Sequence, residues 1–134
     1  MQIALIIALS LHVLSSVFWA GSSFTLARTG GAGGEQLFRP QMGAALVAIL
    51  TGAYLGHLVH AGAFGTAEKI LAVGAFTAMV AAGVQGAIGG RAVRSLCSGT
   101  ADEAGARSRI AVAQRIAAVL LAVTALCMGA ARYA

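Results

Sequence analysis

Charged side chains are scarce in this chain. Of its 134 residues, nine are Lys or Arg and four are Asp or Glu, whereas 59% are hydrophobic and the mean hydropathy is +0.87. A soluble domain of this size needs a charged surface that so few charges cannot supply. No charged side chain occurs from Met1 to Ala27, a segment long enough to span the roughly 30 Å hydrocarbon core as a helix. It has no basic start, and its apolar run exceeds the about 7–15 residues of a signal-peptide core, so we interpret it as a permanent span.

Cysteine, proline and paired acids are equally sparse. Cys97 and Cys127 show no Cys-x-x-Cys spacing, which argues against a redox or zinc motif. We expect these two thiols near opposite membrane faces, where no disulfide can join them. The single proline, Pro40, is expected in the first turn of a helix, where its missing N–H costs little. All four acids fall between apolar stretches, which argues against an acid-based proton pump, and no phosphate loop or hydrolase triad occurs.

The apolar residues form four long stretches. They predict an all-α integral membrane protein, a single domain over residues 1–134 with four transmembrane helices in an up-down bundle. The expected helices cover about residues 2–27, 40–60, 67–90 and 107–132. A glycine-rich segment separates the first two helices, and Thr66 with Glu68 is expected to cap the third.

Most of the basic residues fall in or beside the first and third connections. These are Arg28, Arg39, Arg91, Arg94, Arg107 and Arg109. By the positive-inside rule, those connections are cytoplasmic and both termini are periplasmic. The preference for Ala, Gly and Arg over Lys is typical of a GC-rich bacterial genome, so we expect a multi-pass protein of the bacterial inner membrane. The net charge of +5 therefore indicates orientation in a lipid bilayer, and no nucleic-acid partner is expected.

Small residues recur at helical spacing in the second and third spans. They are Gly52 and Gly56 in the second, and Gly74, Ala78, Ala82, Gly86 and Gly90 in the third. Such residues let helices approach closely in lipid. We expect them to pack the bundle itself, in preference to forming a homo-oligomer interface.

His12 lies about midway along the first span, where a titratable side chain is costly and usually functional. Ser15, Ser16, Trp19 and Ser23 follow it at helical spacing, so they share its face. Because lipid offers no hydrogen-bond partner, we expect this face to point into the bundle. His12 is then a ligand or proton carrier, or else a neutral histidine that joins helices through a carbonyl.

Other candidate residues lie near the outer ends of the second and third spans. His57 and His60 are one turn apart and could hold a metal, and with Cys127 and Met128 they form a candidate Cu(I) site. Lys69 is expected to snorkel to the interface or to bind a carboxylate. In the third span, Gln85 is expected to bridge helices.

The depths of the histidines restrict a haem site. At about 1.5 Å of rise per residue, His12 lies about 15 Å and His57 about 5 Å below the outer surface. Two axial ligands of one iron need similar depths, so the mismatch disfavours a His12–His57 pair. A haem held by one histidine, or a porphyrin held by His12 and a lysine-bound propionate, fits better.

The first span also resembles a known family. Leu11-His12, Trp19, Gly21, Phe24, Leu26 and Arg28 resemble the first helix of HemJ-type protoporphyrinogen oxidases and of CopD-like copper-resistance proteins. His12, Trp19 and Arg28 keep the family's spacings of seven and nine residues. Leu37-Phe38-Arg39 and Glu68-Lys69-Ile70-Leu71 are similar as well. The family's Leu-Pro-Arg is replaced by Leu26-Ala27-Arg28, and its Asn-Glu-x-Pro by Gln114-Arg115-Ile116-Ala117.

The resemblance implies a membrane haem b or porphyrin site. In it His12 is ligand or proton acceptor, Lys69 is the essential partner, Trp19 lines the pocket and Arg28 belongs to the motif. It further implies oxidation of protoporphyrinogen IX, with quinone or another respiratory component as electron acceptor. A relative that binds haem without this reaction, a copper-binding or copper-transport protein using His57 and His60, and an accessory subunit of a larger membrane complex are the alternatives.

Overall fold

The computed structural model describes residues 1–62, 64–100 and 102–134. Its elements are α1 (Gln2–Arg28), α2 (Gly34–Val59), α3 (Thr66–Val84), the π-helical turn η1 (Gln85–Gly89), α4 (Gly90–Ser98) and α5 (Glu103–Ala131), with no strand in the described ranges. Because α3, η1 and α4 form one continuous rod, the described residues contain four helices long and apolar enough to cross a membrane. The predicted all-α, four-helix membrane fold is confirmed. Ala63 and Ala101, in the predicted second and third connections, lie outside the described residues.

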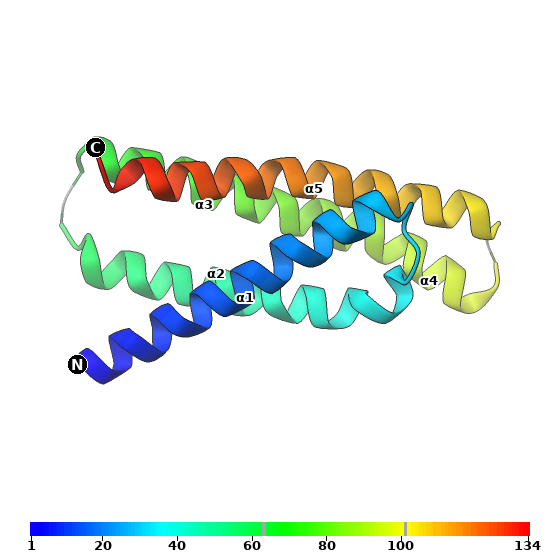
Figure 1. Ribbon diagram of the computed structural model, residues 1–134, viewed down its shortest axis with the longest axis horizontal. Helices are drawn as coiled ribbons and strands as arrows, with labels where there is room; N and C mark the ends of the chain where they lie inside the picture. The colour runs from blue at the N-terminus through cyan, green and yellow to red at the C-terminus, as the bar shows by residue number, and fades with distance from the viewer. Residues whose placement is uncertain (63, 101) are drawn as a thin grey trace.

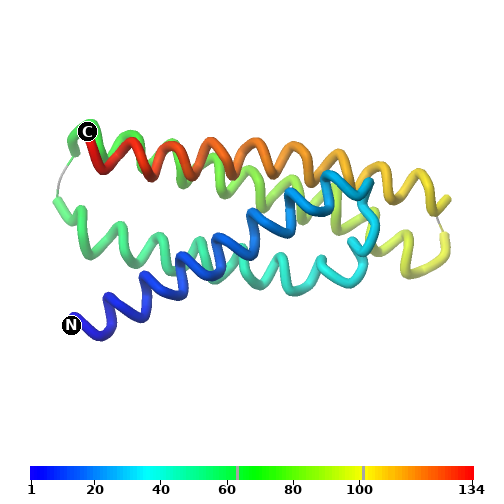
Figure 2. The backbone as a smooth tube through the Cα atoms, viewed as in Figure 1, coloured from blue at the N-terminus to red at the C-terminus, as the bar shows by residue number. Residues whose placement is uncertain are grey.

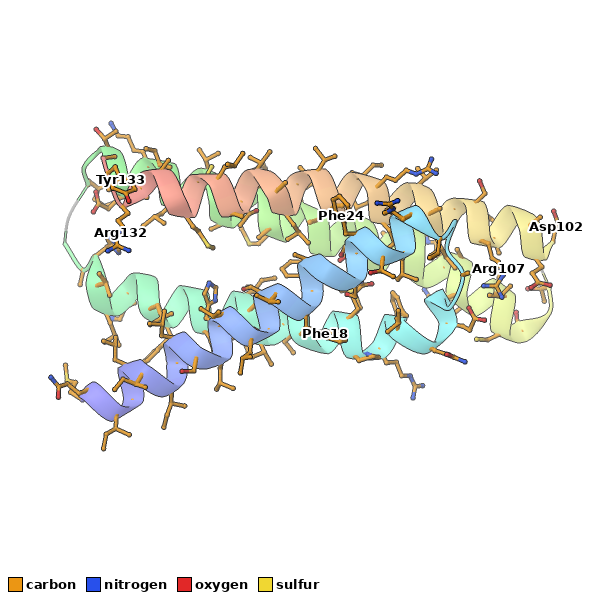
Figure 3. All side chains as sticks on the ribbon, in the orientation of Figure 1. Phe18, Phe24, Asp102, Arg107, Arg132 and Tyr133 are labelled. Carbon is orange, nitrogen blue, oxygen red and sulfur yellow. The ribbon has the colours of Figure 1, made fainter. Side chains whose placement is uncertain are left out.

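The four rods form an elongated bundle with both termini at the same end (Figure 1). α3 and α5 run side by side along its length, whereas α1 crosses obliquely from α2 toward α5 (Figure 2). We call the end that holds the termini and the α2–α3 connection the open end, and the opposite end the closed end. Arg107 and Asp102 lie at the closed end, and Arg132 and Tyr133 lie at the open end (Figure 3).

Alanine dominates the middle of the bundle. Trp19 packs there in a cluster with Ala45, Ala48, Ala78, Ala81, Ala117 and Leu121. Small side chains allow the close helix approach on which association in lipid depends. Large apolar side chains such as Phe24, Leu50 and Phe76 are instead exposed on the outside. Small residues inside and large apolar residues outside suit a bundle that is surrounded by hydrocarbon.

The start of α2 differs from the prediction. The helix begins at Gly34, so Pro40 lies inside it and not in its first turn. Gly33 makes the entry with φ at 80°, in the left-handed region that favours glycine. Glu35 then receives two hydrogen bonds from Arg107 of α5, at 3.1 and 3.2 Å. These contacts connect the first turn of α2 to α5, a link that the local sequence does not indicate.

The third rod also extends further than predicted, to Ser98 and not to about Gly90. The π-turn η1 adds one residue to its helical turn. The buried positions that follow it are therefore rotated around the rod relative to a regular α-helix. Gly74, Ala78 and Gly90 of the predicted small-residue stripe are buried, but Ala82 and Gly86 are only half-buried. A Cβ atom at Gly74 would lie 3.0 Å from Cβ of Cys127 on α5, so the predicted close approach of the helices is confirmed there. The fourth rod likewise begins earlier, at Glu103.

Candidate functional site

A cavity of about 940 Å³ occupies the open half of the bundle. We call it the open-end cavity; all four rods contribute to it, with His12 and Trp19 from α1, Gly52 from α2, Met79 from α3 and Met128 from α5, and His60 adds to it just after α2. Its walls are mostly aliphatic. The volume lies near the upper limit of the about 300–1,000 Å³ typical of ligand sites. The open-end cavity therefore has the size and character of a site for a large apolar molecule.

His12 is one of the titratable residues that line the open-end cavity, with His60 and Glu68. Its Nδ1 lies 2.9 Å from the carbonyl oxygen of Ala48 and 3.2 Å from Oγ1 of Thr51, both on α2. A carbonyl oxygen only accepts, so Nδ1 carries a hydrogen, and in the neutral form of such a ring the lone pair is on Nε2. Within the described part of the chain, Nε2 has no hydrogen-bond partner. Histidines that ligate metals commonly donate their other ring N–H to a carbonyl in this way.

Gly52 makes room for the imidazole. A Cβ atom at this position would lie 2.9 Å from Cε1 of His12 and 3.3 Å from its Nδ1. The glycine therefore allows α2 to pass directly over the ring, with the Ala48 carbonyl within bonding distance. One turn further on, Gly56 lines the cavity with no atom within 4 Å of the corresponding position. These glycines create space and do not serve only as helix contacts.

The polar face of α1 points inward, as predicted. Trp19 and Ser23 are buried and Ser16 lines the open-end cavity. Ser15 and Ser23 donate to the carbonyls of Leu11 and Trp19, one turn back, at 2.6 and 2.8 Å. The serines thus satisfy their own helix, and the group that orients His12 comes from α2.

His60 and Glu68 lie at the mouth of the cavity, on either side of the α2–α3 connection. Nε2 of His60 is 4.0 Å from Oε1 of Glu68, and Nδ1 of His60 is buried without a hydrogen-bond partner among the described residues. The Glu68 carboxylate also accepts from the backbone N–H of Gly65 at 2.7 Å. Glu68 therefore caps α3 as predicted, whereas Thr66 is its first residue and not its cap.

Several predicted site residues lie outside the open-end cavity. His57 and Lys69 are exposed and do not line it, although each neighbours the mouth in sequence. Arg28 is exposed at the closed end. Met128 lines the cavity but Cys127 packs on Gly74. Over the described ranges, no group of three or more His, Cys, Asp and Glu side chains could hold a metal ion.

A buried polar network lies beyond Trp19, toward the closed end. Trp19 Nε1 donates to Gln85 Oε1 at 2.6 Å, and Gln85 Nε2 donates to Ser23 and to Gln114, at 2.7 and 2.8 Å. Gln114 and Gln41 exchange a reciprocal pair of amide bonds at 2.9 and 3.1 Å. We call these residues the glutamine network; its three amides come from three different rods.

The glutamine network confirms the bridging role predicted for Gln85 and adds two partners that sequence reasoning missed. Gln41 and Gln114 are as buried as Gln85, with at most 1% of their surface exposed. Their signal in the sequence is a single uncharged amide within each apolar stretch. Because a polar side chain in a span faces the bundle interior, this pattern could have predicted the network.

No family model, curated protein or solved structure matches this chain.

Proposed function

We propose that this multi-pass membrane protein binds haem b or a related porphyrin in the open-end cavity, with His12 Nε2 as the iron ligand. One observation carries the proposal: His12 lines a cavity of about 940 Å³ while its Nδ1 is occupied by the Ala48 carbonyl, so that Nε2 is the ring nitrogen left for a ligand. The resemblance of His12, Trp19 and Arg28 to the HemJ-type motif points to the same class of ligand.

The residues of the cavity fit such a group. Aliphatic side chains suit the faces of a macrocycle, and His12 offers one nitrogen, which favours a haem held by a single histidine. Lys69, exposed beside the mouth residue Glu68, is the cation we assign to a propionate at the membrane surface. Haem supplies one-electron chemistry when bound. The protein's part is to fix the ligand nitrogen, exclude water and keep the site within the membrane.

A redox role follows from this proposal, with quinone or another respiratory component as electron acceptor. Oxidation of protoporphyrinogen IX is the specific activity that the resemblance suggests. For that reaction the porphyrin is the substrate and not an iron-bound cofactor, so Nε2 of His12 is unligated and is the atom we assign to accept a proton from it. We further propose a bacterial inner-membrane location with periplasmic termini, because arginines concentrate at the closed end.

The test is an absorption spectrum of the detergent-purified protein, oxidised and then reduced with dithionite. We expect a Soret band with α and β bands after reduction, and loss of these bands in His12→Ala. His57→Ala is the matched control, because His57 is exposed and does not line the cavity. A His12→Ala protein that is folded and keeps an unchanged spectrum would contradict the assignment.

Copper is the second candidate, because His60 and Met128 line the same cavity and soft sulfur with imidazole suits Cu(I). Metal analysis of the same sample tests it. The copper proposal requires stoichiometric copper that is lost when His57 and His60 are both replaced by alanine. Absence of both haem and copper, together with a fixed co-purifying protein, would instead support an accessory subunit.

A further inference from the structure

A second cavity lies at the closed end, between α2 and the rod formed by η1 and α4. Its volume is about 630 Å³. We call it the arginine cavity; Phe38 and Arg39 of α2, Gly86 of η1, and Gly90, Arg94 and Cys97 of α4 line it. None of these residues lines the open-end cavity, so this is a separate site.

The arginine cavity carries a positive charge that its own residues do not neutralise. Among the described residues, neither Arg39 nor Arg94 forms a salt bridge. Arg94 only donates from Nε to the Gly90 carbonyl of its own helix, at 3.4 Å. The one acid in the lining, Glu35, is already bound by Arg107 through two hydrogen bonds at 3.1 and 3.2 Å. Two guanidinium groups thus remain available to an anion.

The rest of the lining is apolar. The Phe38 ring packs on Gly90, where a Cβ atom would lie 3.0 Å from Cζ of the ring, and Val93 adds to the same wall. A substituent on Gly86 would meet no atom within 4 Å, so space remains beside the ring. On α2, the exposed apolar side chains of Leu46 and Leu50 follow Arg39 at helical spacing and extend the same face of the rod.

We propose that the arginine cavity binds the headgroup phosphate of an anionic phospholipid. Guanidinium groups match phosphate oxygens in geometry as well as in charge, and basic pockets between membrane helices near the headgroup level suit anionic lipids. The apolar walls of the cavity, with Leu46 and Leu50 beyond them on α2, accommodate the glycerol and acyl chains of a lipid. A soluble phosphate has no such apolar part. Lipid at this place joins α2 to α4, the rods that carry the two arginines.

Cys97 provides a direct readout, since its exposed thiol lines the cavity. In delipidated, detergent-solubilised protein, the alkylation rate of Cys97 by an uncharged maleimide is followed by peptide mass spectrometry. Phosphatidylglycerol should slow alkylation at least threefold, whereas phosphatidylcholine and inorganic phosphate should leave the rate unchanged. Equal protection by inorganic phosphate would overturn the lipid assignment in favour of a soluble anion. No protection by phosphatidylglycerol would overturn the site.

A matched pair of variants tests the residues. Arg39→Gln with Arg94→Gln should abolish protection by phosphatidylglycerol. Arg91→Gln with Arg109→Gln removes the same charge from exposed positions outside the cavity and should preserve protection. If both pairs of variants lost protection of Cys97 equally, general charge attraction would explain the protection and the proposal would be overturned. Should the first pair not fold, Gly86→Leu fills the cavity while keeping both arginines, and protection must again disappear.

Discussion

The two halves of the bundle use the same four rods in opposite ways. Toward the closed end, Gln41, Gln85 and Gln114 bring three rods together through buried, mutually satisfied amides. Toward the open end, Gly52 lets α2 pass close over the His12 ring, Gly56 borders open space, and a cavity of about 940 Å³ remains. We therefore assign an architectural role to the closed half, whose glutamine network has no unused polar group. We assign the functional role to the open half, which holds a histidine nitrogen without a partner in the described chain.

Trp19 joins the two halves. Its ring is 2% exposed and lines the open-end cavity, while its Nε1 donates to Gln85 in the glutamine network. The closed half therefore fixes one wall of the cavity. If this division is correct, changes in the glutamine network should lower stability, and changes around His12 should lower ligand binding with little effect on stability.

The largest expected effect on stability is that of Gln85→Leu. The change leaves Trp19 Nε1 buried without its acceptor and removes both amide donations from Gln85. An unpaired buried polar group costs about 1–3 kcal/mol, so the free energy of unfolding, measured by SDS titration in mixed micelles, should fall by that amount. Gln36→Leu makes the same change at an exposed position of α2 and should cost less than about 0.5 kcal/mol. Equal losses in both variants would show that the network adds no stability.

Gly52→Ala should act on the other half of the molecule. The new Cβ atom would lie 2.9 Å from Cε1 of His12, so the imidazole must move and its bond to the Ala48 carbonyl is strained. Loss of such support for a ligating histidine weakens binding about tenfold, which a haem titration of the apo-protein measures. Gly56→Ala, one turn away with no atom within 4 Å, is the control and should bind normally. A Gly52→Ala protein with wild-type affinity would show that the position of His12 does not control binding.

Thr51→Val should have the smallest effect. Its hydroxyl lies 3.2 Å from His12 Nδ1, but it also donates to the Val47 carbonyl of its own helix at 2.6 Å. The Ala48 carbonyl remains as the main acceptor for His12, so we expect haem binding to weaken only about 2- to 3-fold. Thr25→Val, which removes a similar bond within α1 at an exposed position, should leave the affinity unchanged. If Thr51→Val weakened haem binding more than Gly52→Ala, the Thr51 hydroxyl, and not the Ala48 carbonyl, would be the main partner that positions His12.

The fold could be predicted from the sequence because it depends on length and composition. Each apolar stretch exceeds the thickness of the bilayer core, and a polar face in lipid must turn inward, so both the four spans and the inward orientation of His12 follow. The start of α2 at Gly34 could not be predicted in this way. The first turn of this helix holds Glu35, whose partner Arg107 lies on a different rod and far apart in the chain, so the local sequence does not indicate the contact.

The candidate site could be predicted only in part. His12 and Trp19 line the open-end cavity, whereas His57 and Lys69 do not. Sequence position gives their depth near the membrane surface but not the side of the helix that faces the cavity. A backbone carbonyl as the partner of His12 was one of the two interpretations of the sequence, and the contact with Ala48 agrees with it. Which carbonyl it is could not be predicted, because every residue has one. Helix rotation and crossing, set by the small residues of the core, decide which carbonyl is reached.

The most direct test of the central claim is chemical rescue of His12→Gly. If His12 supplies the iron ligand, the purified variant should show no Soret band with added haem alone, and millimolar imidazole should restore a spectrum close to that of the wild-type protein. The vacated space beside Gly52 would then accept the free ring in place of the side chain. A folded His12→Gly protein that binds haem with a wild-type spectrum in the absence of imidazole would contradict the account.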